Sequence, residues 1–82
     1  MKEVTNYLNN KLDQDENLVR ITFYEIRIKY NLSEEETETF LELAKNKFEN
    51  TGYNVFFTGD TYEYENIPKV VQTNELMVAV KK

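Results

Sequence analysis

The chain has 82 residues, contains neither cysteine nor histidine, and carries 10 basic against 15 acidic residues, a net charge of −5. Its length is that of one small domain, and a hydrophobic share of 40% is enough for a core and too high for a disordered chain. The missing cysteine and histidine exclude disulfides, thiolate zinc sites, cysteine nucleophiles and histidine bases. We therefore expect a single domain over residues 1–82 that is not an enzyme and binds no cofactor or metal ion.

The N-terminal segment argues against secretion and against membrane insertion. Residues 1–12 are polar and lack the charged and apolar regions of a signal peptide, and no apolar run approaches transmembrane length. We expect a cytoplasmic protein without a membrane partner.

The first part of the chain predicts a helix followed by a short strand. Val4, Leu8 and Leu12 recur on one face, which predicts an amphipathic helix over residues 2–12. The apolar residues 18–21 predict the strand.

Two helix starts follow in close succession. Thr22 stands three residues before Glu25, the spacing of a capping box, and predicts a helix over residues 23–30 that ends near Asn31. Ser33 and Glu36 repeat this spacing. They predict a third helix up to residue 50, with an apolar stripe formed by Phe40, Leu41, Ala44 and Phe48.

Beyond Gly52 the chain has the pattern of β-strands. Residues 53–58 are aromatic and β-branched, Gly59 and Asp60 form a turn signal, and residues 61–65 alternate, so a hairpin is predicted here. After an interruption at residues 66–68, a last strand is predicted over residues 76–80, with Leu76, Val78 and Val80 on one face.

This order of elements resembles the winged helix-turn-helix domain over nearly the whole chain. The residues that carry the resemblance are residues 21–26 at the second helix start, residues 30–33 as the turn, the apolar stripe of the third helix, and the strands from Tyr53 and Leu76. The resemblance implies an α+β fold with three helices, a short strand and a C-terminal hairpin wing. It also implies that the third helix enters the DNA major groove while the wing, at residues 58–66, contacts the flanking backbone.

The charges at these positions differ from those of a DNA-binding member. The third helix has six glutamates against two lysines, a net charge of −4, and the wing adds three carboxylates. Affinity for duplex DNA depends on cationic side chains that neutralise the phosphates, whereas carboxylates repel the phosphates. Glu38, Glu42 and Glu49 lie within about a quadrant and a half of each other on the helix, with Lys45 on the same side.

The first hypothesis is therefore an acidic module that binds and occludes a basic partner protein, including a nucleic-acid-binding one. Small inhibitors from phages and plasmids, such as anti-CRISPR proteins, are of this general kind. The candidate protein-binding residues are Glu38, Glu42, Glu49, Asp60, Tyr62, Glu63, Tyr64 and Glu65.

Three alternatives remain at this point. One is a regulator that binds double-stranded DNA as a homodimer and uses Arg27, Lys29, Lys45 and Lys47. In the second, the glutamates form only a solvated face, as most charge runs do. In the third, Tyr62 and Tyr64 are not interface residues and pack against the last strand, through Leu76 and Val78, or against the first helix.

Overall fold

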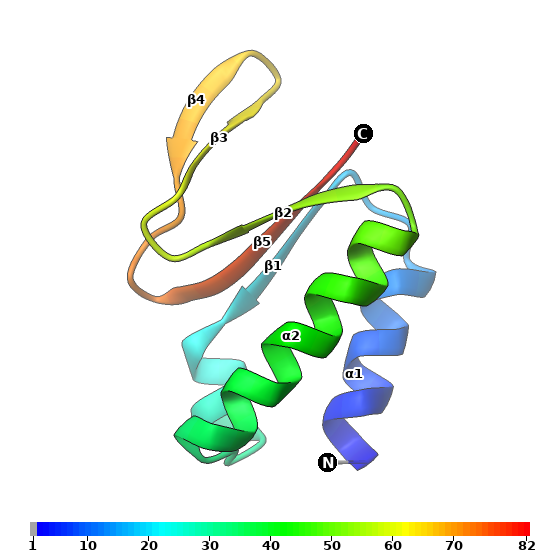
Figure 1. The fold of residues 1–82 in the computed structure, drawn as a ribbon, viewed down its shortest axis with the longest axis vertical. Coiled ribbons are helices and arrows are strands. Elements are labelled where there is room, and N and C mark those ends of the chain that lie inside the picture. The colour runs from blue at the N-terminus through cyan, green and yellow to red at the C-terminus, as the bar shows by residue number, and fades with distance from the viewer. Residues whose placement is uncertain (1) are drawn as a thin grey trace.

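The computed structural model describes residues 2–82 and has an α+β fold with antiparallel strands (Figure 1). In chain order the elements are α1 (Lys2–Asp13), β1 (Leu18–Thr22), the π-helix η1 (Tyr24–Lys29), α2 (Glu34–Asn50), β2 (Tyr53–Phe57), β3 (Thr61–Tyr64), β4 (Ile67–Val70) and β5 (Glu75–Lys81). The predicted first helix, the short strand, the long helix and the last strand are confirmed.

The C-terminal strand β5 forms the centre of a three-stranded sheet with the order β1-β5-β2. Both neighbours are antiparallel to it, so that Val19 on β1 and Val55 on β2 lie opposite Ala79 on β5. Strands β3 and β4 form a separate two-stranded hairpin between β2 and β5.

The predicted hairpin between residues 53–58 and 61–65 is wrong. Gly59, at φ +90°, does not close a hairpin but leads the chain out of the sheet, and β2 pairs with β5 instead. The partner of β3 is β4, which contains Pro68 and was expected to be an interruption. A proline is tolerated there because β4 is an edge strand.

The sheet separates two hydrophobic clusters, because successive side chains of a strand point to opposite faces. Met77 and Ala79 face α1 and α2 and belong to the main core with Leu8, Phe40 and Phe48. Val78 and Val80 face the other way and pack with Tyr62 and Val71 of the hairpin region. The helices therefore cover one face of the sheet and the hairpin covers part of the other.

One side chain of β5 departs from the predicted alternation. Leu76 was expected to share a face with Val78 and Val80, but it packs against the helix-side core. The register shifts between Ile21 and Thr22 of β1, where Thr22 lies opposite Glu75. Such a bulge changes which face a neighbouring side chain occupies.

The segment predicted as the second helix forms the short π-helix η1, which is wider than an α-helix. The Phe23 N–H donates to the carbonyl oxygen of Asn74 at 2.9 Å, so the chain stays attached to the sheet through Phe23. The Tyr30 N–H then donates to the Glu25 carbonyl at 3.0 Å, five residues back, as in a π-helix. Asn31 has φ +55° and ends the segment, as predicted. Residues 2–82 thus contain two α-helices and one short π-helix, not three α-helices.

Candidate protein-binding surface

The acidic face of α2 begins at a complete capping box. The Glu36 N–H donates to Ser33 Oγ at 3.1 Å, and the Ser33 N–H donates to Glu36 Oε1 at 2.9 Å. The hydrogen bond from the Ser33 backbone, and then the contact with the Ser33 side chain, lower the pKa of the Glu36 carboxyl below its ordinary value. The predicted cap at Ser33 is confirmed, and it sets where α2 begins.

The side of α2 turned away from the core carries the predicted glutamates. Thr37, Phe40, Ala44 and Phe48 are the buried residues of the helix. At 100° per residue, Glu38, Glu42 and Glu49 lie within about 40° of one another on the outer side. All three are exposed, as the interaction hypothesis requires.

These carboxylates are not neutralised by the protein itself. Within residues 2–82, the ion pairs are Arg20 with Glu75 and Lys81 with Asp15, and neither involves α2. Glu34, Glu38 and Glu42 follow one another at intervals of four residues, so each neighbours the next along the helix surface. Like charges at this spacing destabilise a helix. Lys45 lies on the same side, three residues after Glu42, but forms no ion pair with it, so the repulsion within the row of Glu34, Glu38 and Glu42 is not offset by a paired cation.

The acidic residues of the hairpin do not extend this face. The hairpin lies on the opposite side of the sheet from α2, so Glu63 and Glu65 form a second, separate acidic surface. Asp60 has a structural contact, because its Oδ2 accepts the Phe57 N–H at 2.8 Å in the turn. The single surface expected from α2 and the wing together is not present.

The two tyrosines of β3 differ in exposure. Tyr62 is only 8% exposed and packs on Val71 and Val78, with its ring 5.5 Å from that of Phe56, so its assignment as a partner contact is wrong. The alternative that it packs against the last strand is the correct one. Tyr64 is half-buried at the rim of the same cluster, and its role in binding stays a prediction.

The cations of the DNA-binding alternative do not form one stripe. Lys45 and Lys47 are both half-buried but lie about 160° apart around α2. Arg27 and Lys29 lie on η1, each over an aromatic ring, 5.5 Å from the Phe23 centroid and 5.6 Å from that of Tyr30. The outer face of α2 therefore offers no continuous row of positive charge to a phosphate backbone.

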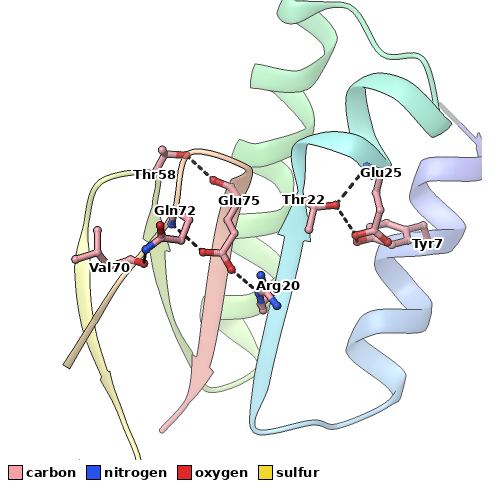
Figure 2. Close-up of polar contacts among 8 residues, drawn as sticks. All are labelled: Tyr7, Arg20, Thr22, Glu25, Thr58, Val70, Gln72 and Glu75. Atoms are coloured by element: carbon pink, nitrogen blue, oxygen red, sulfur yellow. Dashed lines mark hydrogen bonds and ion pairs between the residues drawn. The ribbon is translucent and has the colours of Figure 1, made fainter. Parts of the chain in front are cut away.

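Two polar networks were not predicted and hold this framework together (Figure 2). At the start of η1, Glu25 Oε1 accepts the hydroxyls of Thr22 at 3.0 Å and Tyr7 at 3.1 Å. The Glu25 N–H donates to Thr22 Oγ1 at 3.3 Å, as predicted. The N-cap of η1 is nevertheless Phe23, which has no side-chain cap, and the Glu25 side chain turns to hydroxyls, so the predicted capping box at Thr22 is wrong. The Thr22–Glu25 spacing in the sequence indicated the contact between these two residues, but no local pattern indicated the hydrogen bond from Tyr7.

The second network surrounds Glu75 at the base of the hairpin. Glu75 is 3% exposed, and its carboxylate accepts the Gln72 N–H at 2.8 Å and pairs with Arg20 on the neighbouring strand (Figure 2). Its carbonyl oxygen accepts the Thr58 hydroxyl at 2.6 Å. A buried carboxylate with these partners links β1, β5 and the two ends of the hairpin insertion. The only sequence signal was a single glutamate at the start of an apolar strand.

Other kinds of site are not found in the part of the chain that the structure describes. Residues 2–82 bring together no group of three or more acidic side chains placed to hold a metal ion. Within the same residues, every helix is too short or too polar to cross a membrane.

Comparison with known proteins adds no relative. Neither a protein-family model, nor a curated protein, nor a solved structure matches the chain.

Proposed function

We propose that this protein is a non-enzymatic binding module whose acidic α2 face contacts a basic surface on a partner protein and occludes it. The observation that carries this proposal is the row of Glu34, Glu38 and Glu42, which has no ion pair within the described residues and repels itself along the helix. A positively charged partner would relieve this repulsion on binding. Complementary charge also accelerates encounter and excludes wrong partners.

We further propose that the fold is a variant of the winged helix in which the wing is a long hairpin. The order α1, β1, η1, α2, β2, hairpin, β5 and the sheet order β1-β5-β2 support this assignment. On such a scaffold α2 takes the place of the helix that enters DNA. Its exposed carboxylates favour a basic protein over a phosphate backbone in that place.

A partner that itself binds nucleic acid offers the required surface. Such proteins carry clustered lysine and arginine where phosphates bind. Occupation of that cluster by α2 would block it, which is how a small inhibitor from a phage or plasmid would act. The location of the pair would then be the cytoplasm.

The test compares two variants with the same change in net charge. Glu38→Lys, Glu42→Lys and Glu49→Lys together reverse the α2 face. Glu3→Lys, Asp13→Lys and Glu16→Lys together reverse three exposed carboxylates of α1 and the following loop. Both variants are used to capture proteins from a lysate of the encoding organism, and surface plasmon resonance then measures the captured partner.

We expect wild type and the α1 variant to bind the same basic partner and the α2 variant to associate far more slowly at low salt. Added salt should weaken the wild-type association, because rim charges act mainly through the on-rate. Equal binding by both variants would show that the α2 face is only solvated.

Fluorescence anisotropy with mixed-sequence duplex tests the DNA alternative. We expect no binding tighter than the nonspecific range of about 10⁻⁴ to 10⁻⁶ M. Nanomolar, sequence-selective binding that requires Arg27, Lys29, Lys45 and Lys47 would replace the proposal by a DNA-binding regulator.

A further inference from the structure

The outer side of η1 carries an apolar patch next to the acidic face. Phe23, Tyr24 and Ile28 are 41%, 65% and 58% exposed, although large apolar side chains are usually buried. Tyr24 and Phe23 also line an open hollow together with Thr22, Thr73 and Asn74. These three residues, Phe23, Tyr24 and Ile28, are called the η1 patch below.

The charge around the η1 patch is positive. Glu25 is the acidic residue of η1, but its carboxylate turns inward to the hydroxyls of Tyr7 and Thr22. Arg27 and Lys29 have no carboxylate partner among residues 2–82, so they leave the surface of η1 positive. This charge is opposite to that of the α2 face.

The two oppositely charged surfaces are neighbours. The cyan segment of η1 lies beside the first turns of α2 at one end of the molecule (Figure 1). A surface with adjacent positive and negative areas is complementary to itself after a half-turn about an axis between them. In that arrangement, η1 of each copy meets α2 of the other.

We propose that two copies of this chain form a symmetric dimer in which the η1 patch, with Arg27 and Lys29, packs against the acidic α2 face of the second copy. This inference rests on the proposed function in one respect, since it names a basic surface that the same α2 face binds. A basic partner protein would then compete with dimerisation. The second copy is favoured as occupant because the chain itself carries both halves of the contact.

The proposed contact, three exposed apolar side chains with a charged rim, is expected to form a weak, reversible dimer. A standard stable interface buries about 800 Å² per partner, or roughly 15% of the 5337 Å² surface of this chain. An apolar centre with a charged rim is the usual anatomy of such contacts. Because Lys29, Glu38 and Glu42 are exposed and Arg27 is only half-buried, the dimer should weaken as salt rises.

Charge exchange between two variants tests the proposal. Variant A carries Arg27→Glu and Lys29→Glu, and variant B carries Glu38→Lys and Glu42→Lys. In a dimer of either variant alone, η1 and the facing α2 carry charges of the same sign at both contacts. The concentration for half-dimerisation in sedimentation equilibrium should therefore rise at least about tenfold. An equimolar mixture restores opposite charges at both contacts and should dimerise again. Circular dichroism confirms that each variant is folded.

An apolar pair of substitutions tests the η1 patch without changing charge. Tyr24→Ala with Ile28→Ala should also raise the half-dimerisation concentration. Ile67→Ala with Val70→Ala removes exposed apolar side chains of β4, on the other side of the sheet, and should leave dimerisation unchanged.

A wild-type chain that stays monomeric at millimolar concentration and low salt would overturn the dimer, as would a mixture of A and B that stays monomeric. Either outcome leaves the proposed function intact if the α2 reversal still abolishes partner capture. If the dimer forms but no basic protein is captured through α2, the proposed function fails and the dimer stands.

Discussion

The hydroxyl of Tyr7 donates a hydrogen bond to Glu25 Oε1 across 3.1 Å and 18 residues of sequence, and so joins the middle of α1 to the start of η1. The same tyrosine ring lies 5.5 Å from the ring of Tyr30 at the other end of η1. Tyr7 thus contacts both ends of the segment that presents the η1 patch. The orientation of this segment therefore depends on α1 as well as on the local contacts of Thr22.

Tyr7→Phe should reduce the free energy of unfolding by about 1–2 kcal/mol, because it removes a hydrogen bond to a charged acceptor and leaves the ring in place. Urea denaturation followed by circular dichroism measures the change. Tyr64→Phe is the matched control. The Tyr64 hydroxyl has no hydrogen-bond partner in residues 2–82, so its removal should change stability by less than about 0.5 kcal/mol. Equal effects of the two substitutions would contradict the role of the Tyr7 contact.

Stability should fall in alkaline solution, and Tyr7 should cause part of the fall. Burial, and then the neighbouring Glu25 carboxylate, raise the pKa of Tyr7 above its ordinary value of about 10. The folded protein therefore holds this proton more tightly than the unfolded chain does. Its contribution to stability is complete below about pH 10 and is lost as the pH rises toward the folded pKa. Burial also raises the pKa of Tyr62, in the same direction.

The measurement is the free energy of unfolding between pH 8 and pH 11 for wild type and Tyr7→Phe. Wild type should lose stability more steeply above pH 10, and the two curves should approach each other. Parallel curves would show that the Tyr7 proton is not linked to folding.

Ser33→Ala should cost about 0.5–2 kcal/mol, because it removes one half of the capping box that starts α2. Thr22→Ala should fall in the same range, since it removes the acceptor of the Glu25 N–H and a donor to the Glu25 carboxylate. Thr39→Ala, on the exposed surface of α2, should be neutral or stabilising because alanine is the better helix former. Chemical denaturation compares the three, and a loss confined to Thr39→Ala would count against the capping account.

Glu65→Asn should stabilise the protein by about 0.5–1 kcal/mol. Glu65 and Asn66 form the two-residue turn between β3 and β4 with φ of +54° and +65°, a conformation that favours Asn or Gly over Glu. Glu63→Asn makes the same change of charge on the adjacent strand, where φ is not positive, and should not stabilise. Thermal unfolding distinguishes the two, and an equal gain from both would assign the effect to charge.

Much of the fold was predictable because its signals are local. The Ser33–Glu36 spacing and the apolar stripe of α2 depend on residues within one or two turns, and Asn31 ended η1 as predicted. Strand partners depend on contacts distant in sequence. Gly59 and Asp60 carry the local signal of a hairpin turn, but the turn of the hairpin is formed by Glu65 and Asn66, neither of which is glycine.

The candidate site was predictable in part for the same reason. The exposure of Glu38 and Glu42 follows from helix periodicity once the buried stripe is known. The burial of Tyr62 depends on how the hairpin folds onto Val78, which no local pattern records. The η1 patch was missed because Phe23, Tyr24 and Ile28 resemble core residues in sequence. Their exposure follows from the short π-helical geometry.

The two segments of chain that connect the hairpin to the sheet are hydrogen-bonded to each other where the hairpin begins and ends. The Gly59 N–H donates to the Val71 carbonyl at 3.0 Å, and the Val71 N–H donates to the Asp60 carbonyl at 2.9 Å, so the two ends of the insertion are already joined. Hairpins of other lengths could be grafted at this neck without moving β2 or β5. Any replacement would need an aromatic side chain in the place of Tyr62, since Phe56 and Val78 would otherwise lose their cover. The far face of the sheet is in this sense an exchangeable module, and the α2 face could evolve independently of it.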